Sequence, residues 1–350
     1  MKRIACWLIL TVLLAGALPV SALATTPDPI PVLSESEIRK TPKGIYHYML
    51  ICMDCWGEER IEGTSERKPT DLNKKGHHTD GLVLVTVDTY ARRVMLTSFI
   101  RDMLIWRSAK PDGSDPSFGR INNILEKYLE NGGDGVGGIE RMIETINNHF
   151  DLRIEKYIVV DFRQVQRIID AIGGVDITID GDEAKRLKSY GMSADATSPA
   201  LAGGGTYHFK GYAAVIYMRI RKEAMHYIDE NGVERKETQD VGRTRRTRVV
   251  LSTIADSLKD ITYDQAEKLL NTVVENTVYT NMSTNDLLEA LDIAMDLKGT
   301  PVEGIRMPID GSYGLFPYAG MSTQQVDFVV NREALWEFLM DPFAVVEDIE

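Results

Sequence analysis

Arginines follow or interrupt apolar sequence at three separate points of the chain, where an unpaired charge would be costly. One ends the apolar run 94–100, a pair lies within 217–221, and one closes the motif 240–243. The planar guanidinium group matches two phosphate oxygens at once. Each of these arginines, taken alone, is more often part of a surface ion pair than of a phosphate site. Their number indicates a phosphate-rich ligand, such as a pyrophosphate, bound by Arg101, Arg219, Arg221 and Arg243.

Three aspartates lie at expected turns or strand ends, close in sequence to this set. Asp54 follows the first expected strand, Asp80 precedes the apolar run at Leu82, and Asp102 follows Arg101. Magnesium is commonly held by one or two carboxylates, water and the phosphates of a substrate. A lone aspartate at such a place is usually a turn or cap residue. Asp102 could accept a proton or orient an arginine, and the orienting role is favoured.

Short apolar runs predict the strands that would position these groups. The run Leu82–Val87 is nearly continuous, which is typical of a strand buried on both faces of a sheet. A turn at Asp88–Arg92 then leads into a hairpin partner. The other expected strands are Tyr46–Met53, Arg93–Phe99, Tyr157–Val160 and Val175–Ile179.

Helical spacing alternates with the strands, which indicates an α/β layered domain. Capping boxes at Asp161 with Gln164 and at Ser283 with Asp286 predict two helix starts. Asp240 is expected to cap a third helix, and Met218–Arg221 is expected to be extended, with its two arginines on one side. The helix that Asp240 would cap is expected at Val241–Leu258, and further helices at Ile121–Leu129 and Ile139–Phe150.

Three polar or glycine-rich segments are interpreted as loops. Segments Ala184–Gly205 and Glu223–Gln239 lack clear periodicity and are expected to be long surface loops. The glycines of 132–138 do not follow a strand, so a loop between helices is favoured over a dinucleotide site. Cys52 and Cys55 allow a local disulfide outside the cell, but two small buried residues at a strand end is the favoured interpretation.

Composition limits the function and suggests export. The chain has 350 residues and a net charge of −12, which argues against a general nucleic-acid binder. Lys2, Arg3 and the apolar run Ile4–Val20 precede a small-residue cleavage site at Ala22-Leu23-Ala24. We therefore expect residues 1–24 to be a signal peptide, with an uncleaved membrane anchor as the alternative. Residues 25–43 would form a tether, and 44–350 a single catalytic domain with a C-terminal extension of helices and strands.

An ordered series of short motifs resembles the LytR-CpsA-Psr family over nearly the whole exported length. Each motif is weak alone, but the order of the series is specific. The segments that carry the resemblance are Cys52–Asp54, His78–Gly81, Ser98–Asp102, Arg120–Asn122, Tyr157–Phe162, Asp170–Val175, Tyr217–Arg221 and Asp240–Arg243.

The resemblance implies a three-layer α-β-α sandwich around a mixed central sheet, at the outer face of the cytoplasmic membrane or secreted into the cell wall. It implies transfer of a glycopolymer from a polyprenyl (undecaprenyl) pyrophosphate to peptidoglycan. Asp54 and Asp80 would hold Mg²⁺, and an apolar cavity would take the prenyl tail. Catalytic roles would fall to Arg101, Asp102, Arg219, Arg221 and Arg243, and further substrate contacts to His78, Arg120, Asp240 and Arg246.

The chain departs from the family pattern at four positions, which keeps other functions open. His78 and Trp56 replace arginines, Ile100 replaces a proline, and Thr247 stands where a glutamine is usual. His78 could donate to phosphate if protonated, although an exposed turn histidine is the more usual role. A polyprenyl pyrophosphate hydrolase and a non-catalytic binder of lipid-linked intermediates therefore remain as alternatives.

Overall fold

The computed structural model describes residues 26–55, 70–190, 201, 203–228, 232–275 and 277–340. The expected signal or anchor, and the departure at Trp56, lie outside these residues. Over the described ranges, no helix has the length and apolarity needed to cross a membrane.

A six-stranded mixed sheet forms the centre of the fold, in the order β11-β6-β1-β2-β3-β12. β2 pairs antiparallel with both β1 and β3, whereas β1–β6 and β3–β12 are parallel pairs. The strands are β1 (Ile45–Met53), β2 (Thr79–Asp88), β3 (Arg93–Phe99), β6 (Lys156–Asp161), β11 (Tyr279–Thr280) and β12 (Val302–Met307). The expected strands of this sheet are confirmed.

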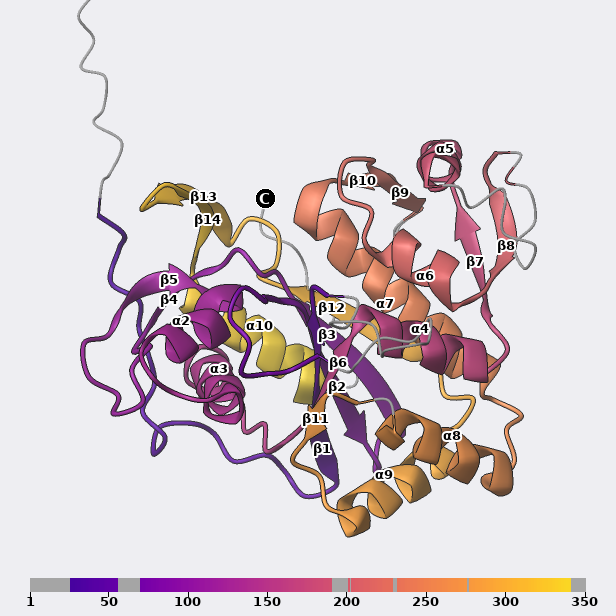
Figure 1. Cartoon of the computed structure of the whole chain (residues 1–350), viewed down its shortest axis with the longest axis horizontal. Helices are drawn as coiled ribbons and strands as arrows, with labels where there is room; N and C mark the ends of the chain where they lie inside the picture. Colours follow the sequence, from indigo (N-terminus) through magenta and orange to yellow (C-terminus); the bar gives the residue numbers. More distant parts are fainter. Residues whose placement is uncertain are drawn as a thin grey trace, which may run out of the picture.

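Helices cover both faces of the sheet and make the predicted α-β-α sandwich (Figure 1). One face packs on α2 (Ile124–Glu130), α3 (Gly135–Phe150) and α10 (Phe328–Met340). The other face carries α4 (Phe162–Ala171), α6 (Gly211–Met218), α7 (Gln239–Ser257), α8 (Tyr263–Glu275) and α9 (Thr284–Asp296). Because both faces are buried, the central strands are mostly apolar, with a few buried polar residues such as His47, Thr86 and Thr97.

Side-chain alternation along β1 shows how one strand serves both layers. Met49, Ile51 and Met53 belong to the larger core with α2, α3 and α10. Cys52 points to the opposite face, where it packs with Val160, Phe162 and Val215. The period of two along a strand places these residues on alternate faces.

Local helix signals are confirmed in three places. Asp161 and Ser283 each form a complete capping box, at the starts of α4 and α9. The helix expected at Ile121–Leu129 is present as a 3-10 turn (Ile121–Asn123) followed by α2. These signals depend on contacts within a few residues, which the sequence contains in full.

Several expectations for the polar segments are wrong. Segment Glu223–Gln239 contains a hairpin of β9 (Met225–Ile228) and β10 (Glu234–Glu237). Segment Ala184–Gly205 contributes most of α5 (Gly181–Ser189), which Asp180 caps. The glycines of 132–138 are only partly a loop, since Asp134 caps α3 and the helix begins at Gly135.

Three small antiparallel pairs complete the strand inventory of the described residues. They are β4 (Leu104–Arg107) with β5 (Ser117–Arg120), β7 (Val175–Ile179) with β8 (Gly205–Phe209), and β13 (Tyr313–Tyr318) with β14 (Met321–Val326). In Figure 1, the β4–β5 and β13–β14 pairs stand on one side of the central sheet, and β7–β8 and β9–β10 on the other. One end of the central sheet, where β1 and β3 end and β2 begins, carries Asp54, Asp80 and Arg101.

The two expectations for the arginine segments also need correction. Met218–Arg221 is not extended, because α6 ends at Met218 and Arg219 is its C-terminal cap residue. Asp240 does not cap α7; Thr238 occupies the cap position, and Asp240 lies in the first turn. A carboxylate in the first turn is still favoured by the helix dipole.

Candidate functional site

A β-bulge between β1 and β2 presents the central carboxylate of the site. Cys52 is opposite Gly81 and Met53 is opposite Thr79, so Asp80 is the extra residue of the bulge. A bulge re-aims one side chain out of the regular alternation. A Cβ atom at Gly81 would lie 2.8 Å from the Cβ atom of Cys52, so only glycine allows the strands to approach this closely.

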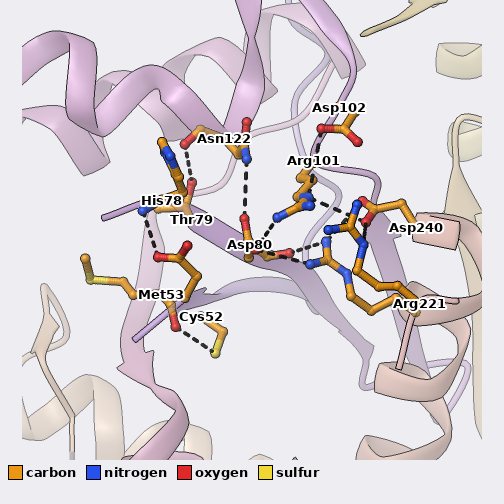
Figure 2. A network of polar contacts seen from close by, with 12 residues as sticks. Cys52, Met53, His78, Thr79, Asp80, Arg101, Asp102, Asn122, Arg221 and Asp240 are labelled. Atoms are coloured by element: carbon orange, nitrogen blue, oxygen red, sulfur yellow. Dashed lines mark hydrogen bonds and ion pairs between the residues drawn. The ribbon is translucent and has the colours of Figure 1, made fainter. Parts of the chain in front are cut away.

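Asp80 binds three side chains that come from distant parts of the chain (Figure 2). One carboxylate oxygen pairs with Arg101 and lies 3.2 Å from Nη1 of Arg243, and the other accepts from Asn122 Nδ2 at 3.3 Å. The Asp80 carbonyl also accepts from Nη2 of Arg243 at 2.9 Å. Burial would raise the pKa of Asp80, but the charges of Arg243 and Arg101 outweigh it and lower the pKa below 3.8.

A second carboxylate, Asp240, lies among three guanidinium groups. Its Oδ1 is 3.5 Å from Nε of Arg101 and 3.3 Å from Nε of Arg221, and its Oδ2 is 3.0 Å from Nη2 of Arg243. The side chain is only 10% exposed. Because a phosphate would be repelled by this carboxylate, the predicted substrate contact at Asp240 is better interpreted as a charge that holds the arginines together and in place.

The positive groups are crowded enough to affect each other. Burial and the neighbouring charge of Arg101 lower the pKa of Arg221 below its ordinary value. The guanidinium of Arg219 lies 4.5 Å from the centre of the Phe162 ring, a cation–π contact. Arginines held this close to one another favour an anionic ligand between them.

One cavity of about 290 Å³ collects the predicted arginines from three parts of the chain, together with Asp54 and Asp80. Arg101 comes from the end of β3, Arg219 and Arg221 from the end of α6, and Arg243 from the first turns of α7. Gly81, Phe162 and Met218 also line it, and the sequence did not single these out. The full lining is Cys52, Asp54, Asp80, Gly81, Arg101, Phe162, Met218, Arg219, Arg221, Arg243 and Thr247.

Asp54 and Asp80 offer the carboxylates for a divalent cation. Oδ1 of Asp54 accepts from the backbone NH of His78 at 3.0 Å, and the residue lines the cavity beside Asp80. Among the described residues there is no cluster of three or more histidine, cysteine, aspartate or glutamate side chains suited to a metal. Two carboxylates fit a magnesium ion that takes its remaining ligands from water and phosphate. They do not fit a site built from protein alone.

Two other predicted residues lie beside the cavity. Nε of Arg120 is 3.6 Å from Oδ1 of Asp102, and its Nη2 donates to the Ser322 carbonyl at 2.7 Å. Nε of Arg101 lies 3.9 Å from the same Asp102 oxygen. Asp102 therefore sits between two arginines, and neither it nor Arg120 is part of the cavity lining.

His78 and Thr247 show what the departures from the family pattern do locally. Nδ1 of His78 is 3.6 Å from a carboxylate oxygen of Glu126, and the histidine does not line the cavity. Thr247 does line it, and its hydroxyl donates to the Arg243 carbonyl one helical turn earlier at 3.1 Å. A threonine is shorter than the glutamine usual at this position, and here its hydroxyl bonds its own helix.

The prediction that Arg246 contacts substrate is wrong for this structure. Its side chain is 0% exposed and pairs with Glu183 at 2.6 Å. Its two terminal nitrogens each donate at 3.0 Å to a backbone carbonyl, those of Ile220 and Glu223. All of its donor groups thus face the protein interior and not the cavity.

Asn122 is a site residue that the sequence analysis did not predict. It follows Arg120-Ile121 in a motif quoted for its basic residue, and it is the residue that bonds Asp80. The available signal was its place in the segment Arg120–Asn122, one of the segments that carry the family resemblance. Cys52 and Cys55 are both buried and are not joined in a disulfide, and Sγ of Cys55 lies 3.0 Å from the hydroxyl of Thr70. The interpretation as small buried residues fits these positions.

A second, apolar cavity of about 370 Å³ lies on the same face of the sheet. Val85, Val87 and Val94 form its floor, and side chains of α8 and α9 form its cover. Gly81, Val85 and Val87 share one face of β2, so the charged and apolar cavities follow each other along this strand. α7 contributes to both cavities, with Arg243 and Thr247 at one and Ala255 and Leu258 at the other.

Residues 53–334 match the model of the LytR_cpsA_psr family. This range contains every lining residue of both cavities except Cys52. The chain belongs to the LytR_cpsA_psr family. The resemblance carried by the short motifs is therefore confirmed.

Curated relatives within this family are distant in sequence. Biofilm regulatory protein A of Streptococcus mutans is 25% identical over 263 residues, or 72% of this chain and 57% of the relative. The Bacillus subtilis protein named polyisoprenyl-teichoic acid–peptidoglycan teichoic acid transferase TagV is 26% identical over 190 residues, or 54% of this chain and 41% of TagV. The chain thus spans about half the length of these relatives.

Solved structures of family members share the fold. The crystal structure of B. subtilis TagV has a TM-score of 0.56 at 20% identity, covering 85% of this chain and 98% of the TagV chain in that structure. A structure described as TagT bound to LIIa-WTA has a TM-score of 0.59 at 17% identity, covering 88% of this chain and 96% of TagT. At such low identity, the similarity establishes the common fold alone.

Proposed function

We propose that this protein is a phosphotransferase that moves a glycopolymer from a polyprenyl pyrophosphate carrier to peptidoglycan. The observation that carries the proposal is the succession of a charged and an apolar cavity along one sheet face. A lipid pyrophosphate has the same two parts in the same order. Relatives named for transferring teichoic acid from a polyisoprenyl carrier to peptidoglycan support this substrate class.

The spacing of the cavities suits a lipid that is continuous with its pyrophosphate. Along β2, Gly81 and Val85 are about 13 Å apart, and along α7, Thr247 and Ala255 are about 12 Å apart. Several consecutive units of a prenyl chain span that length. The apolar lining from β2, α7, α8 and α9 would take the tail, while the arginines take the diphosphate.

In the proposed reaction an acceptor hydroxyl of peptidoglycan attacks the phosphorus that carries the glycan. A new oxygen–phosphorus bond forms, the bond to the bridging oxygen breaks, and polyprenyl phosphate leaves with that oxygen. Arg101, Arg219, Arg221 and Arg243 stabilise charge on the phosphoryl oxygens, which is the main task in this chemistry. Magnesium held by Asp54 and Asp80 would add positive charge there.

Asp102 is placed to orient Arg101 and Arg120, or to receive the proton of the acceptor. Burial and the charge of Asp240 raise the pKa of Asp102. The carboxylate is charged above this raised pKa. As the pH falls, it therefore loses its charge at a higher pH than an ordinary aspartate would. An activity that needs this charge must decline in the same direction.

We expect Asp102→Asn to lower transfer about tenfold and to remove the decline on the acid side of the pH–rate profile. A general base would give a larger loss of about 10²- to 10⁴-fold. Transfer rates of both proteins between pH 4 and 8 provide the measurement. An acid limb that persists in the variant would assign it to another group, and a loss of the larger size would assign Asp102 as the base.

The proposed function is tested with purified protein, magnesium and a prenyl pyrophosphate-linked glycan. We expect release of prenyl phosphate only when peptidoglycan is present, together with glycan attached to the peptidoglycan. Release into water without an acceptor would identify a hydrolase instead. Binding of the lipid, seen by native mass spectrometry, with no release under either condition would identify a non-catalytic binder.

We further propose that the protein works outside the cytoplasm, at the membrane surface. The support is the basic and apolar N-terminal sequence of residues 1–24 and the tether of 25–43 that follows it. This location supplies both the lipid carrier and the wall acceptor. Cell fractionation, with an antibody against the domain, would show it outside the membrane; a cytoplasmic signal would contradict the proposal.

A further inference from the structure

The turn that carries two of the cavity arginines is anchored at its start, where the backbone NH groups of Arg219 and Ile220 donate to carbonyls of α6 and Ile220 is buried. Arg219 caps α6, and the chain then passes through Ile220 and Arg221 before β9 begins at Met225. The side chain of Arg221 is 40% exposed, and its Nε lies 3.3 Å from Oδ1 of Asp240. A guanidinium on a short turn can be held in place only if its backbone is fixed from elsewhere.

Arg246 supplies that fixation from the middle of α7. Its Nη1 donates to the carbonyl of Ile220 and its Nη2 to the carbonyl of Glu223, both at 3.0 Å. These two carbonyls flank Arg221, so one planar group bonds the backbone on both sides of it. The arginine is fully buried, which makes each of these bonds costly to lose.

Glu183 on α5 holds the other end of this arrangement. One of its carboxylate oxygens accepts from Nε of Arg246 at 2.6 Å. The other accepts from the backbone NH of Asp180 at 3.0 Å and completes the capping box of α5. Glu183 is 2% exposed, and its buried charge is balanced by its ion pair with Arg246.

Neighbouring contacts support the same geometry. Nε of Arg186, one turn later on α5, lies 3.5 Å from a carboxylate oxygen of Glu223. The Tyr217 ring lies with its centre 5.9 Å from the Arg246 guanidinium. A Cβ atom at Gly242 would lie 3.4 Å from Nη1 of Arg246 and 3.0 Å from the Glu237 carbonyl, so glycine leaves room for the arginine here.

We propose that Arg246, anchored by Glu183, is a positioning residue that fixes the turn 219–223 and thereby sets Arg219 and Arg221 in the cavity. A buried ion pair often adds little to stability compared with an apolar replacement. What this pair provides is geometry: three directional bonds that tie α5 and α7 to one turn. The proposal rests on the proposed function only in naming pyrophosphate as the ligand of that cavity.

The first test needs no ligand. Arg246→Lys keeps the positive charge but offers a single ammonium, which cannot bond Glu183 and both carbonyls at once. We expect faster amide hydrogen exchange in residues 219–224 of this variant, with α3 and the central strands unchanged. Arg248→Lys is the matched control, because Arg248 is buried on the same helix but bonds Ser98 instead of the turn. Unchanged exchange in 219–224, or equal acceleration in the control, would overturn the proposal.

The second test separates positioning from a general loss of structure. Binding of inorganic pyrophosphate is measured by calorimetry in Arg246→Lys, in Arg219→Ala/Arg221→Ala, and in the combined variant. We expect Arg246→Lys to weaken binding about tenfold in the normal background and to have no further effect once both arginines are gone. Equal losses in the two backgrounds would mean that Arg246 acts on the whole fold and not through the turn.

A milder variant and the wild-type result keep the outcomes distinct. Glu183→Gln removes the anchor's charge and replaces one of its two acceptor oxygens by an NH₂ donor, and we expect a smaller change of the same kind if Arg246→Lys does not fold. A wild-type protein that binds no pyrophosphate would contradict the proposed function. The exchange measurement on residues 219–224 would still decide the role of Arg246.

Discussion

Arg101→Ala is expected to lower the rate of glycan transfer by about 10²- to 10³-fold, while the protein remains folded. Losses of this size are typical when one preorganised donor to a developing negative charge is removed. Arg101 lines the cavity and bonds Asp80, and it lies 3.5 Å from Asp240. After its removal Asp80 keeps Arg243 and Asn122 as partners, so no buried carboxylate is left without a donor.

Single-turnover transfer rates and thermal unfolding should be measured together on this variant. Arg92→Ala is the matched control, because Arg92 lies at the start of the same β3 hairpin but is exposed and pairs with Asp296. The control should keep wild-type turnover. Wild-type turnover in Arg101→Ala would remove Arg101 from the catalytic set. A variant that melts far below wild type would show a structural role instead.

Asp80→Ala is expected to abolish transfer and to weaken magnesium binding by more than about 100-fold. Loss of even the groups that support metal ligands costs about 10- to 100-fold in affinity, so loss of a ligand should cost at least as much. The change also removes one of the two carboxylates that Arg101 and Arg243 share, so that Asp240 alone of this pair still lies between their charges. The arginines should then move apart and lose the arrangement that fits a diphosphate.

Titration calorimetry with magnesium, in the presence of pyrophosphate, measures the effect on magnesium binding directly. Asp296→Ala serves as the control, since this aspartate is exposed and pairs with Arg92. Asp54→Ala should weaken magnesium binding too, but should leave the Arg101 and Arg243 contacts intact. Equal magnesium affinity in Asp80→Ala and wild type would eliminate Asp80 as a metal ligand.

Much of the framework was predictable because its signals are local. The apolar runs of β1, β2, β3 and β6 and the capping boxes of α4 and α9 each depend on a few neighbouring residues. Where the pattern failed, tertiary contacts had replaced the local signal. α6 is buried on nearly all sides, so it has no polar face to mark it as a helix, and Met218–Arg221 was misread as extended.

The candidate site was likewise predictable from the sequence only in part. Residue types and motif order determined that arginines and aspartates would gather around a phosphate-rich ligand, since such groups are costly beside apolar sequence unless they meet opposite charge. Only the folded chain decided which of them meet. The bulge aims Asp80 at Arg101 and Arg243, while Arg246, three residues along α7 from Arg243, turns inward to Glu183. A helix advances about 100° per residue, so neighbours in one motif face different surroundings, and those surroundings are set by segments far away in the sequence.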